Sequence, residues 1–242
     1  MGGIFNGDYI QIKRLSENVR NQNYELIFAK TWDDTKRGIG WIEGLPGISP
    51  GRWAVGYNYL YAMSRVLNEK EPKCVLDIGL GISSTLISQY FKGNNDKEGI
   101  HDIIEHDAKW IEFYSKKHEL SDLSAIHTVE CIEKELRGVK YNAYKDISAV
   151  VKGKKYDVIS IDGPLGSDKY SRRDIIEFVP TILNESFVIM MDDSQRDGEQ
   201  ATIMEIEEKL KQSEIEFCEG VYPGKTYCTL ITSADNKFLC SM

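Results

Sequence analysis

Three features are scarce in this sequence of 242 residues, and each scarcity argues against a class of protein. No apolar run approaches the about 20 residues that a membrane-spanning helix needs. The first residues show no basic segment followed by an apolar one, so we expect no secretory signal. The five cysteines are odd in number, scattered and without a C-x-x-C pair, which predicts reduced thiols in a cytoplasmic protein.

Positive charge is also in deficit, because 30 Lys and Arg face 38 Asp and Glu and leave a formal net charge of −8. This balance disfavours a nucleic-acid partner, since binding of phosphates relies on Lys and Arg. Hydrophobic residues make up 41% of the chain and charged residues 28%, as in ordinary globular proteins. The length allows one full-size domain with a core and one appended segment.

From residue 73 onward, short apolar runs alternate with amphipathic segments, which predicts an α/β fold with a mostly parallel sheet. The expected strands are Cys74–Ile78, Asp102–Glu105, Ala125–Cys131, Tyr156–Ile161 and Phe187–Met191. The expected helices are Arg52–Leu67, Ser83–Phe91, Ala108–His118, Arg172–Leu183 and Gln200–Gln212, and Tyr24–Ala29 fits either a helix or a strand. Ile215–Tyr222 and Thr226–Thr232 flank Pro223-Gly224-Lys225 and predict a closing hairpin with an antiparallel edge.

The loop after the first expected strand has the form of a ligand-binding turn. It reads Asp77-Ile-Gly79-Leu-Gly81-Ile-Ser83-Ser84, in which two glycines permit a tight turn and the following helix start offers unpaired amides. The dinucleotide fingerprint G-x-G-x-x-G is not met, because Ser84 stands at its third glycine. Asp77 suits a ligand ammonium or the ordering of the loop amides, which favours a cofactor that carries an amino acid group.

The second expected strand ends in Glu105-His106-Asp107. A carboxylate at this position can accept hydrogen bonds from both hydroxyls of a ribose. Beside the glycine loop, we therefore expect Glu105 to bind a ribose and His106 to lie next to the ribose or adenine.

These residues resemble a family. Val75–Gly81, Ile104–Asp107 and Tyr156–Gly163 are similar, in order, to the first, second and fourth motifs of class I S-adenosylmethionine-dependent methyltransferases, over about residues 55–235. The resemblance implies a Rossmann-like seven-stranded sheet with a reversed last strand, helices on both faces, and S-adenosylmethionine as cofactor. The stretch between Cys131 and Tyr156 departs from the family and leaves the adenine contact open among Glu130, Cys131, Tyr144 and Asp146.

Carboxylates follow the fourth and fifth expected strands, where the family places the methyl group and the acceptor. Asp162, Asp192 and Asp193 are expected to converge there, with Asp162 close to the cofactor and Arg196 in the catalytic set. One carboxylate can act as general base on an acceptor hydroxyl. Alternatively the three can hold Mg²⁺ through oxygen ligands, as in relatives of catechol O-methyltransferase. A structural interpretation is also open, in which Asp192 caps a turn and Asp193 pairs with Arg196.

The acceptor is expected to meet the N-terminal segment, so residues 1–54 are assigned to an N-terminal extension and 55–242 to the cofactor-binding domain. Arg52 opens a helix at this boundary and is a candidate for the cofactor carboxylate or the acceptor. Lys169, Arg172, Arg173 and Arg196 form either an anion site or a solvated face. Whether the extension is a lid, a dimer arm or a packed segment stays open, and with it a homodimer.

The expected function is transfer of a methyl group to a small polar acceptor, on the pattern of bacterial O-methyltransferases of small molecules or surface glycans. An anionic sugar or a nucleotide-linked acceptor fits the basic residues. The competing functions are an NAD- or nucleotide-sugar-binding oxidoreductase, which would share the sheet, and a binding module without catalysis. Ser84 and the position of Asp77 argue against the first of these.

Overall fold

The computed structural model describes residues 3–50, 54–93 and 98–241. A seven-stranded sheet runs through the body in the order β3-β2-β1-β6-β7-β9-β8. Neighbours from β3 to β7 are parallel, and β9 alone runs antiparallel to both β7 and β8. The strands are β1 (Cys74–Ile78), β2 (Ile100–Glu105), β3 (Ser124–Thr128), β6 (Tyr156–Ile161), β7 (Leu183–Met191), β8 (Phe217–Tyr222) and β9 (Cys228–Ser233).

Two apolar clusters cover the two faces of the sheet, because successive side chains of a strand point to opposite faces. In β1, Val75 joins the cluster beneath α1 (Gly3–Lys36), α2 (Tyr57–Arg65) and α3 (Ile82–Gly93). Leu76 and Ile78 join the opposite cluster, which includes residues from α5 (Ser148–Val151) and α6 (Asp197–Gln212). The helices therefore lie on both faces, as expected for buried parallel strands.

The chain crosses from one half of the sheet to the other between β1 and β6. From β1 it proceeds outward through β2, α4 (Ala108–Ser115) and β3, and returns to β6 on the other side of β1. The strand order thus reverses there, and ligands of open α/β sheets bind beyond the carboxyl strand ends at such a point. The expected strands that correspond to β1, β2, β6 and β7 are confirmed, and so is the closing hairpin.

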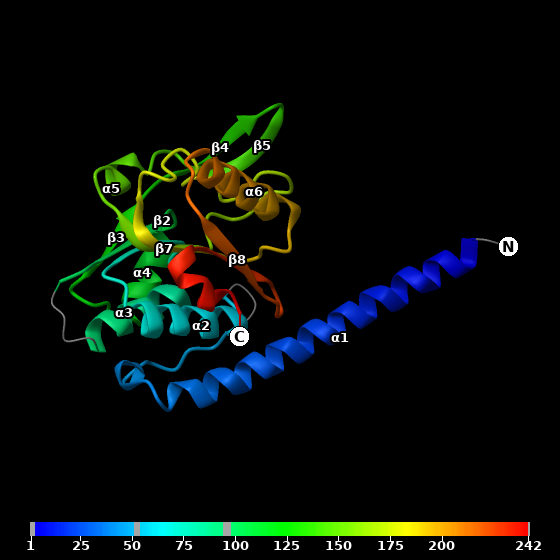
Figure 1. Cartoon of the computed structure of the whole chain (residues 1–242), viewed down its shortest axis with the longest axis horizontal. Helices are drawn as coiled ribbons and strands as arrows, with labels where there is room; N and C mark the ends of the chain where they lie inside the picture. Colours follow the sequence, from blue (N-terminus) through cyan, green and yellow to red (C-terminus); the bar gives the residue numbers. More distant parts are fainter. Residues whose placement is uncertain (1–2, 51–53, 94–97, 242) are drawn as a thin grey trace.

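The most visible element is α1, a helix of 34 residues whose N-terminal half projects well away from the body (Figure 1). Its C-terminal part belongs to the core, because Phe28 and Trp32 are buried in the cluster shared with α2 and α3. Glu25 accepts hydrogen bonds from the backbone N–H of Tyr57, at 2.8 Å, and of Lys225, at 3.1 Å. The expected segment Tyr24–Ala29 is therefore one part of a much longer helix.

Two expectations about elements are wrong. The helix expected over 172–183 is absent and residues 174–182 form turns, because Pro180 has no N–H to donate to the helix ladder and Arg172 has a φ of 53°. Leu183 already belongs to β7. The expected strand Ala125–Cys131 ends at Thr128, and Cys131 begins a separate hairpin of β4 (Cys131–Leu136) and β5 (Val139–Tyr144). Arg137 and Gly138, both with positive φ, form its turn.

The remaining elements are η1 (Gly40–Ile42), the π-helical turn η2 (Val66–Lys70) and η3 (Ala234–Cys240). The expected helix Arg52–Leu67 begins only at Tyr57 and continues into η2. All five cysteines are free. Among the described residues, no helix combines the length and apolar character required to cross a bilayer.

Candidate active site

The glycine loop after β1 lies against the loop after β6. Gly79 has a φ of 107°, and a Cβ built there would lie 3.0 Å from the backbone N of Gly163 and 3.1 Å from the carbonyl C of Asp162. Only glycine fits a backbone approach this close. At Gly81, by contrast, a Cβ would meet no atom within 4 Å. The loop therefore touches the end of β6 at Gly79 and leaves space at Gly81.

Asp77 lies beneath this loop and is fully buried. One carboxylate oxygen accepts hydrogen bonds from the hydroxyls of Ser84, at 2.5 Å, and Ser83, at 3.4 Å. The other accepts one from Ser160 on β6, at 2.6 Å. These contacts are to hydroxyl groups and not to the loop amides: the two serines begin α3, and Ser160 ties Asp77 to the sheet.

Glu105 ends β2 next to the same loop and is largely buried. Its Oε1 accepts hydrogen bonds from the backbone N–H groups of His106, at 2.6 Å, and Asp107, at 2.9 Å. Its Oε2 accepts one from the N–H of Leu80, at 3.2 Å. The carboxylate is thus held rigidly at the edge of the glycine loop, and the His106 ring contacts it at 2.9 Å.

Sequence reasoning missed a second support of the loop. The indole N–H of Trp110 donates to the carbonyl of Leu80 at 2.7 Å. Of the four adenine candidates, Tyr144 reaches the site: its ring centroid lies 6.1 Å from that of His106, and its OH lies 3.0 Å from a Cβ built at Gly163. Asp146 instead caps the turn before α5, and Glu130 forms an exposed ion pair with Lys145.

The three expected carboxylates do converge. Oxygens of Asp162, after β6, and of Asp192 and Asp193, after β7, all lie within 4.8 Å of one another. Asp192 accepts a hydrogen bond from the Thr226 hydroxyl at 3.1 Å. Asp162 is the most exposed member, with 21% of its side chain accessible, and is joined by its N–H to the carbonyl of Ile78 on β1.

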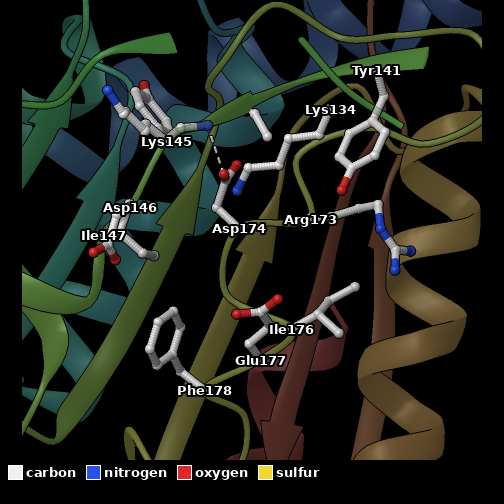
Figure 2. A pocket seen from close by; sticks show the side chains of 12 residues that line it. Lys134, Tyr141, Lys145, Asp146, Ile147, Arg173, Asp174, Ile176, Glu177 and Phe178 are labelled. Carbon is white, nitrogen blue, oxygen red and sulfur yellow. Dashed lines mark hydrogen bonds between the residues drawn. The ribbon is translucent and has the colours of Figure 1, made fainter. Parts of the chain in front are cut away.

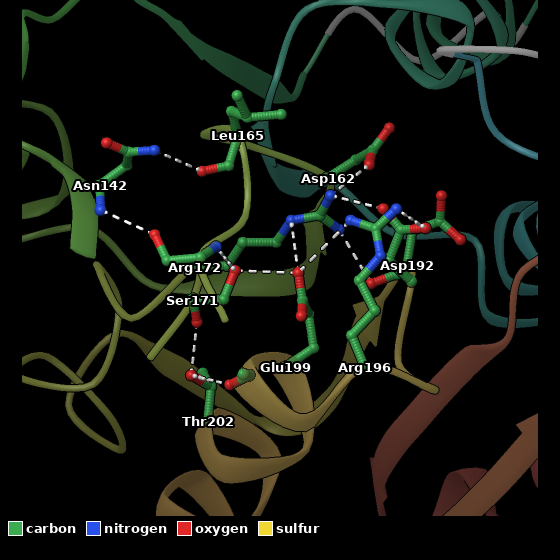
Figure 3. A network of polar contacts seen from close by, with 12 residues as sticks. Asn142, Asp162, Leu165, Ser171, Arg172, Asp192, Arg196, Glu199 and Thr202 are labelled. Atoms are coloured by element: carbon green, nitrogen blue, oxygen red, sulfur yellow. Dashed lines mark hydrogen bonds and ion pairs between the residues drawn. The ribbon is translucent and has the colours of Figure 1, made fainter. Parts of the chain in front are cut away.

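A buried guanidinium stands at the centre of this cluster (Figure 3). Nη2 of Arg172 lies 2.8 Å from Asp193 and 3.1 Å from Asp162, and Nη1 donates to the carbonyl of Asp192 at 2.8 Å. Nε lies 3.6 Å from Glu199, a fully buried carboxylate in the first turn of α6. The sequence did not predict this role, because Arg172 was expected to begin a helix and to lie in an anion site or on a solvated face.

Glu199 is a further member of the network that sequence reasoning did not single out. It accepts a hydrogen bond from the Ser171 hydroxyl at 2.9 Å and lies 3.9 Å from Arg196. The sequence signal that could have identified it is an acidic residue in the first turn of a helix. Arg196 also pairs with Asp193 at 2.8 Å, as the structural interpretation expects, yet half of its side chain is exposed.

Burial controls the protonation of these acids. It raises the pKa of Asp162 well above its usual range, although the Arg172 charge opposes the shift. Burial and the neighbouring Asp193 raise the pKa of Asp192 to about 6. Burial also raises the pKa of Glu199. Carboxylates with raised pKa values beside an open loop are typical of proton-transfer sites.

The same oxygens are of the kind that Mg²⁺ prefers. However, Arg172 already bridges Asp162 and Asp193, so a guanidinium holds the place between them that a divalent cation would need. The three carboxylates are suitable ligands for a hard cation. Arg172, however, occupies the space between two of them and leaves no room for the cation.

A polar pocket opens beside this site, between the β4–β5 hairpin and residues 173–178 (Figure 2). Lys134, Tyr141 and Arg173 line it, with Asp174, whose pKa burial raises to about 6. Its lining includes Tyr144 and Asp146, two of the adenine candidates, but neither Glu105 nor the three clustered aspartates. The hairpin meets the β6 loop through Asn142, whose N–H donates to Ser167 at 3.0 Å.

Arg52 falls outside the described residues. Two tryptophans of the extension pack into the body: Trp32 is buried, and Trp41 meets Tyr90 edge-on at 5.4 Å.

Comparison with solved structures agrees with this architecture. A putative O-methyltransferase from Klebsiella pneumoniae matches with a TM-score of 0.55 and 12% identity, over 89% of this chain and 98% of its own. An O-methyltransferase from Bacillus cereus in complex with SAH matches with a TM-score of 0.50 and 13% identity, over 88% and 91%. No protein-family model and no curated protein matches the sequence. The chain therefore has the class I methyltransferase fold.

Proposed function

We propose that this protein is an S-adenosylmethionine-dependent O-methyltransferase that acts on a small polar acceptor. One observation carries the proposal: the glycine loop and the carboxylate cluster form a single site, because Gly79 lies against the backbone of Asp162. A cofactor bound on the loop would thus present its reactive group to the carboxylates. The shared fold with two O-methyltransferases supports this function and does not favour an oxidoreductase.

In this proposal the cofactor lies over Gly81, Ser83 and Ser84, with Glu105 holding its ribose and His106 beside its adenine. Asp77 positions the loop from below. S-adenosylmethionine supplies an activated methyl group, so the protein needs chiefly to align the acceptor oxygen with it.

Asp162 is the proposed general base, since it is the most exposed carboxylate of the cluster and the nearest to the loop. It would take the proton of the acceptor hydroxyl as that oxygen attacks the activated methyl group that the bound cofactor would supply, with the thioether as leaving group. Asp192, Asp193 and Arg196 complete the catalytic set around it. Burial raises the pKa of Asp162, which makes its ionised form a stronger proton acceptor, and the charge of Arg172 favours that ionised form.

We further propose that Arg172 supplies the positive charge that related enzymes obtain from Mg²⁺. A bridge from Nη2 to both Asp162 and Asp193 supports this proposal. Activity should therefore survive exhaustive chelation, and calorimetry should detect no Mg²⁺ binding to the apo protein. Loss of activity on chelation, restored by Mg²⁺, would assign the three aspartates to a metal site instead.

The proposed acceptor is a hydroxyl of an anionic sugar or a nucleotide-linked sugar, as in the modification of carbohydrates by bacteria. Arg196 supports this choice, because its exposed guanidinium lies at the rim beside Asp193. Arg172 is not available to bind an anionic acceptor, because it is buried and its guanidinium pairs with Asp193. A reducing, cytoplasmic environment suits the five free cysteines.

Calorimetry tests the cofactor without knowledge of the acceptor. S-adenosylmethionine and S-adenosylhomocysteine should bind, and NAD should not. Glu105→Gln should weaken both, since an amide accepts from ribose hydroxyls less strongly than a carboxylate. Asp122→Asn, on the exposed surface, is the matched control. Binding of NAD alone would refute the proposal.

The base is tested by Asp162→Asn, assayed with radiolabelled cofactor against a panel of sugar acids and nucleotide sugars. The variant should retain the fold and lose turnover by at least about a hundredfold. Normal turnover would remove Asp162 from the catalytic set.

A further inference from the structure

An apolar stripe that faces solvent runs along α1, from its projecting half to Leu26 in its anchored part. Its members are Ile12, Leu15, Val19 and Leu26, with exposed fractions of 65%, 58%, 55% and 69%. Large aliphatic side chains exposed in a row mark an interaction surface more often than isolated ones do. No described part of the body covers this stripe, and the proposed function does not require it.

The spacing of the stripe is that of a helix pairing seam. Its members are separated by three, four and seven residues, which is the spacing of apolar positions in a coiled coil. At about 100° per residue they fall within an arc of roughly 60°. Phe28 and Trp32, which anchor α1 in the body, lie on the opposite side of the helix. The stripe is therefore independent of the contacts that hold α1 in place.

The charged residues beside the stripe lie on the other side of α1, so they do not repel a second helix of the same sequence. Lys13, Arg14, Glu17 and Arg20 all project from the side opposite the stripe, by the same helical angles. The residues that border the stripe are uncharged: Gln11, Ser16, Asn18, Gln22 and Asn23. Within residues 11–26, two copies therefore meet without like charges face to face.

We propose that α1 pairs with α1 of a second copy of this chain, through Ile12, Leu15, Val19 and Leu26. A two-fold axis lets the same surface serve both partners. A membrane surface fits less well, because helices that bind lipid combine a broad apolar face with flanking Lys and Arg. The stripe spans about 21 Å of helix, so the dimer should be of the small, concentration-dependent kind.

Sedimentation of the full chain over a range of concentrations tests the proposal. The wild type should approach twice its monomer mass of 27.6 kDa as concentration rises. Val19→Glu places a charge in the seam and should raise the dissociation constant at least about a hundredfold, because a buried unpaired carboxylate is costly.

Ile10→Glu is the matched control, since Ile10 is equally exposed but lies on the opposite side of α1 from the stripe. It should dimerise like the wild type. The proposal would be overturned by a wild type that is still monomeric at about 100 µM, by a dimer insensitive to Val19→Glu, or by equal effects of both variants. Sedimentation of the monomer with anionic vesicles, lost in Val19→Glu, would assign the stripe to a membrane. None of these outcomes depends on methyl transfer.

Discussion

Arg172 is the residue on which the carboxylate site depends. Its guanidinium touches groups from three parts of the chain, namely Asp162 after β6, Asp193 after β7 and Glu199 in α6. Without it, these buried acids would repel one another and take up protons. One cation therefore both assembles the site and sets how much negative charge it carries.

Replacing Arg172 tests this dependence. Arg172→Gln should lower the free energy of unfolding by about 3–5 kcal/mol, since it leaves buried charges without their partner. Arg172→Lys should recover part of the loss, because an ammonium supplies charge but not the planar bridge. Urea unfolding provides the measurement. Lys169→Gln, an exposed change in the adjoining loop, should cost less than about 1 kcal/mol; similar losses in all three variants would contradict the assigned role.

Asp192 predicts a pH dependence of stability. Its pKa rises from the ordinary 3.8 to about 6 on folding, so the folded protein binds this proton more tightly than the unfolded chain. Stability therefore falls as pH rises from about 4 through 6, by up to about 3 kcal/mol. Asp192→Asn removes this cost and keeps an acceptor for Thr226.

Thermal unfolding of Asp192→Asn and of wild type should therefore differ more at pH 8 than at pH 4.5, with the variant more stable at the higher pH. A difference that stays constant with pH would show that Asp192 titrates normally in the fold.

The two glycines of the loop between β1 and α3 lie in different surroundings. Gly79 is confined by the β6 loop, whereas the Cβ position of Gly81 faces open space. Gly79→Ala should destabilise the protein by about 1–3 kcal/mol through its positive φ and the close backbone of Gly163. Gly81→Ala should leave the melting temperature of the apo protein unchanged.

The Gly81→Ala variant should nevertheless bind S-adenosylhomocysteine more weakly than wild type, because its methyl group enters the space proposed for the cofactor. Calorimetry and apo melting curves on the same samples separate the two effects. Unchanged affinity would place the cofactor away from Gly81.

Elements also differ in how far the sequence predicts them. The buried strands Cys74–Ile78 and Tyr156–Ile161 are confirmed residue for residue, because a continuous apolar run in this setting leaves few alternatives. The helix expected over Arg172–Leu183 is wrong, since its apolar spacing arises from turns that face the core. The β4–β5 hairpin was missed because Arg137-Gly138 is an uncommon turn sequence.

At the scale of the whole molecule, α1 divides into an anchored part and a projecting arm (Figure 1). Removal of residues 1–19 should change the free energy of unfolding by less than about 1 kcal/mol, since surface changes away from the core have small effects. Phe28→Ala should cost about 3–5 kcal/mol, because it opens a cavity in the core. Both are measured by urea unfolding at a low protein concentration, and a large loss on truncation would show that the arm packs on the body.

The sequence by itself determined the order of the main-sheet strands along the chain, the position of the glycine loop and the identity of the acids at the strand ends. These follow from local periodicity and from the rule that parallel strands carry their ligands at one edge. Only the tertiary structure decided that Arg172 enters the carboxylate cluster, that Asp77 faces three serines, and that one stripe of α1 faces solvent. These features depend on contacts between residues far apart in the chain, and local sequence patterns do not specify such contacts.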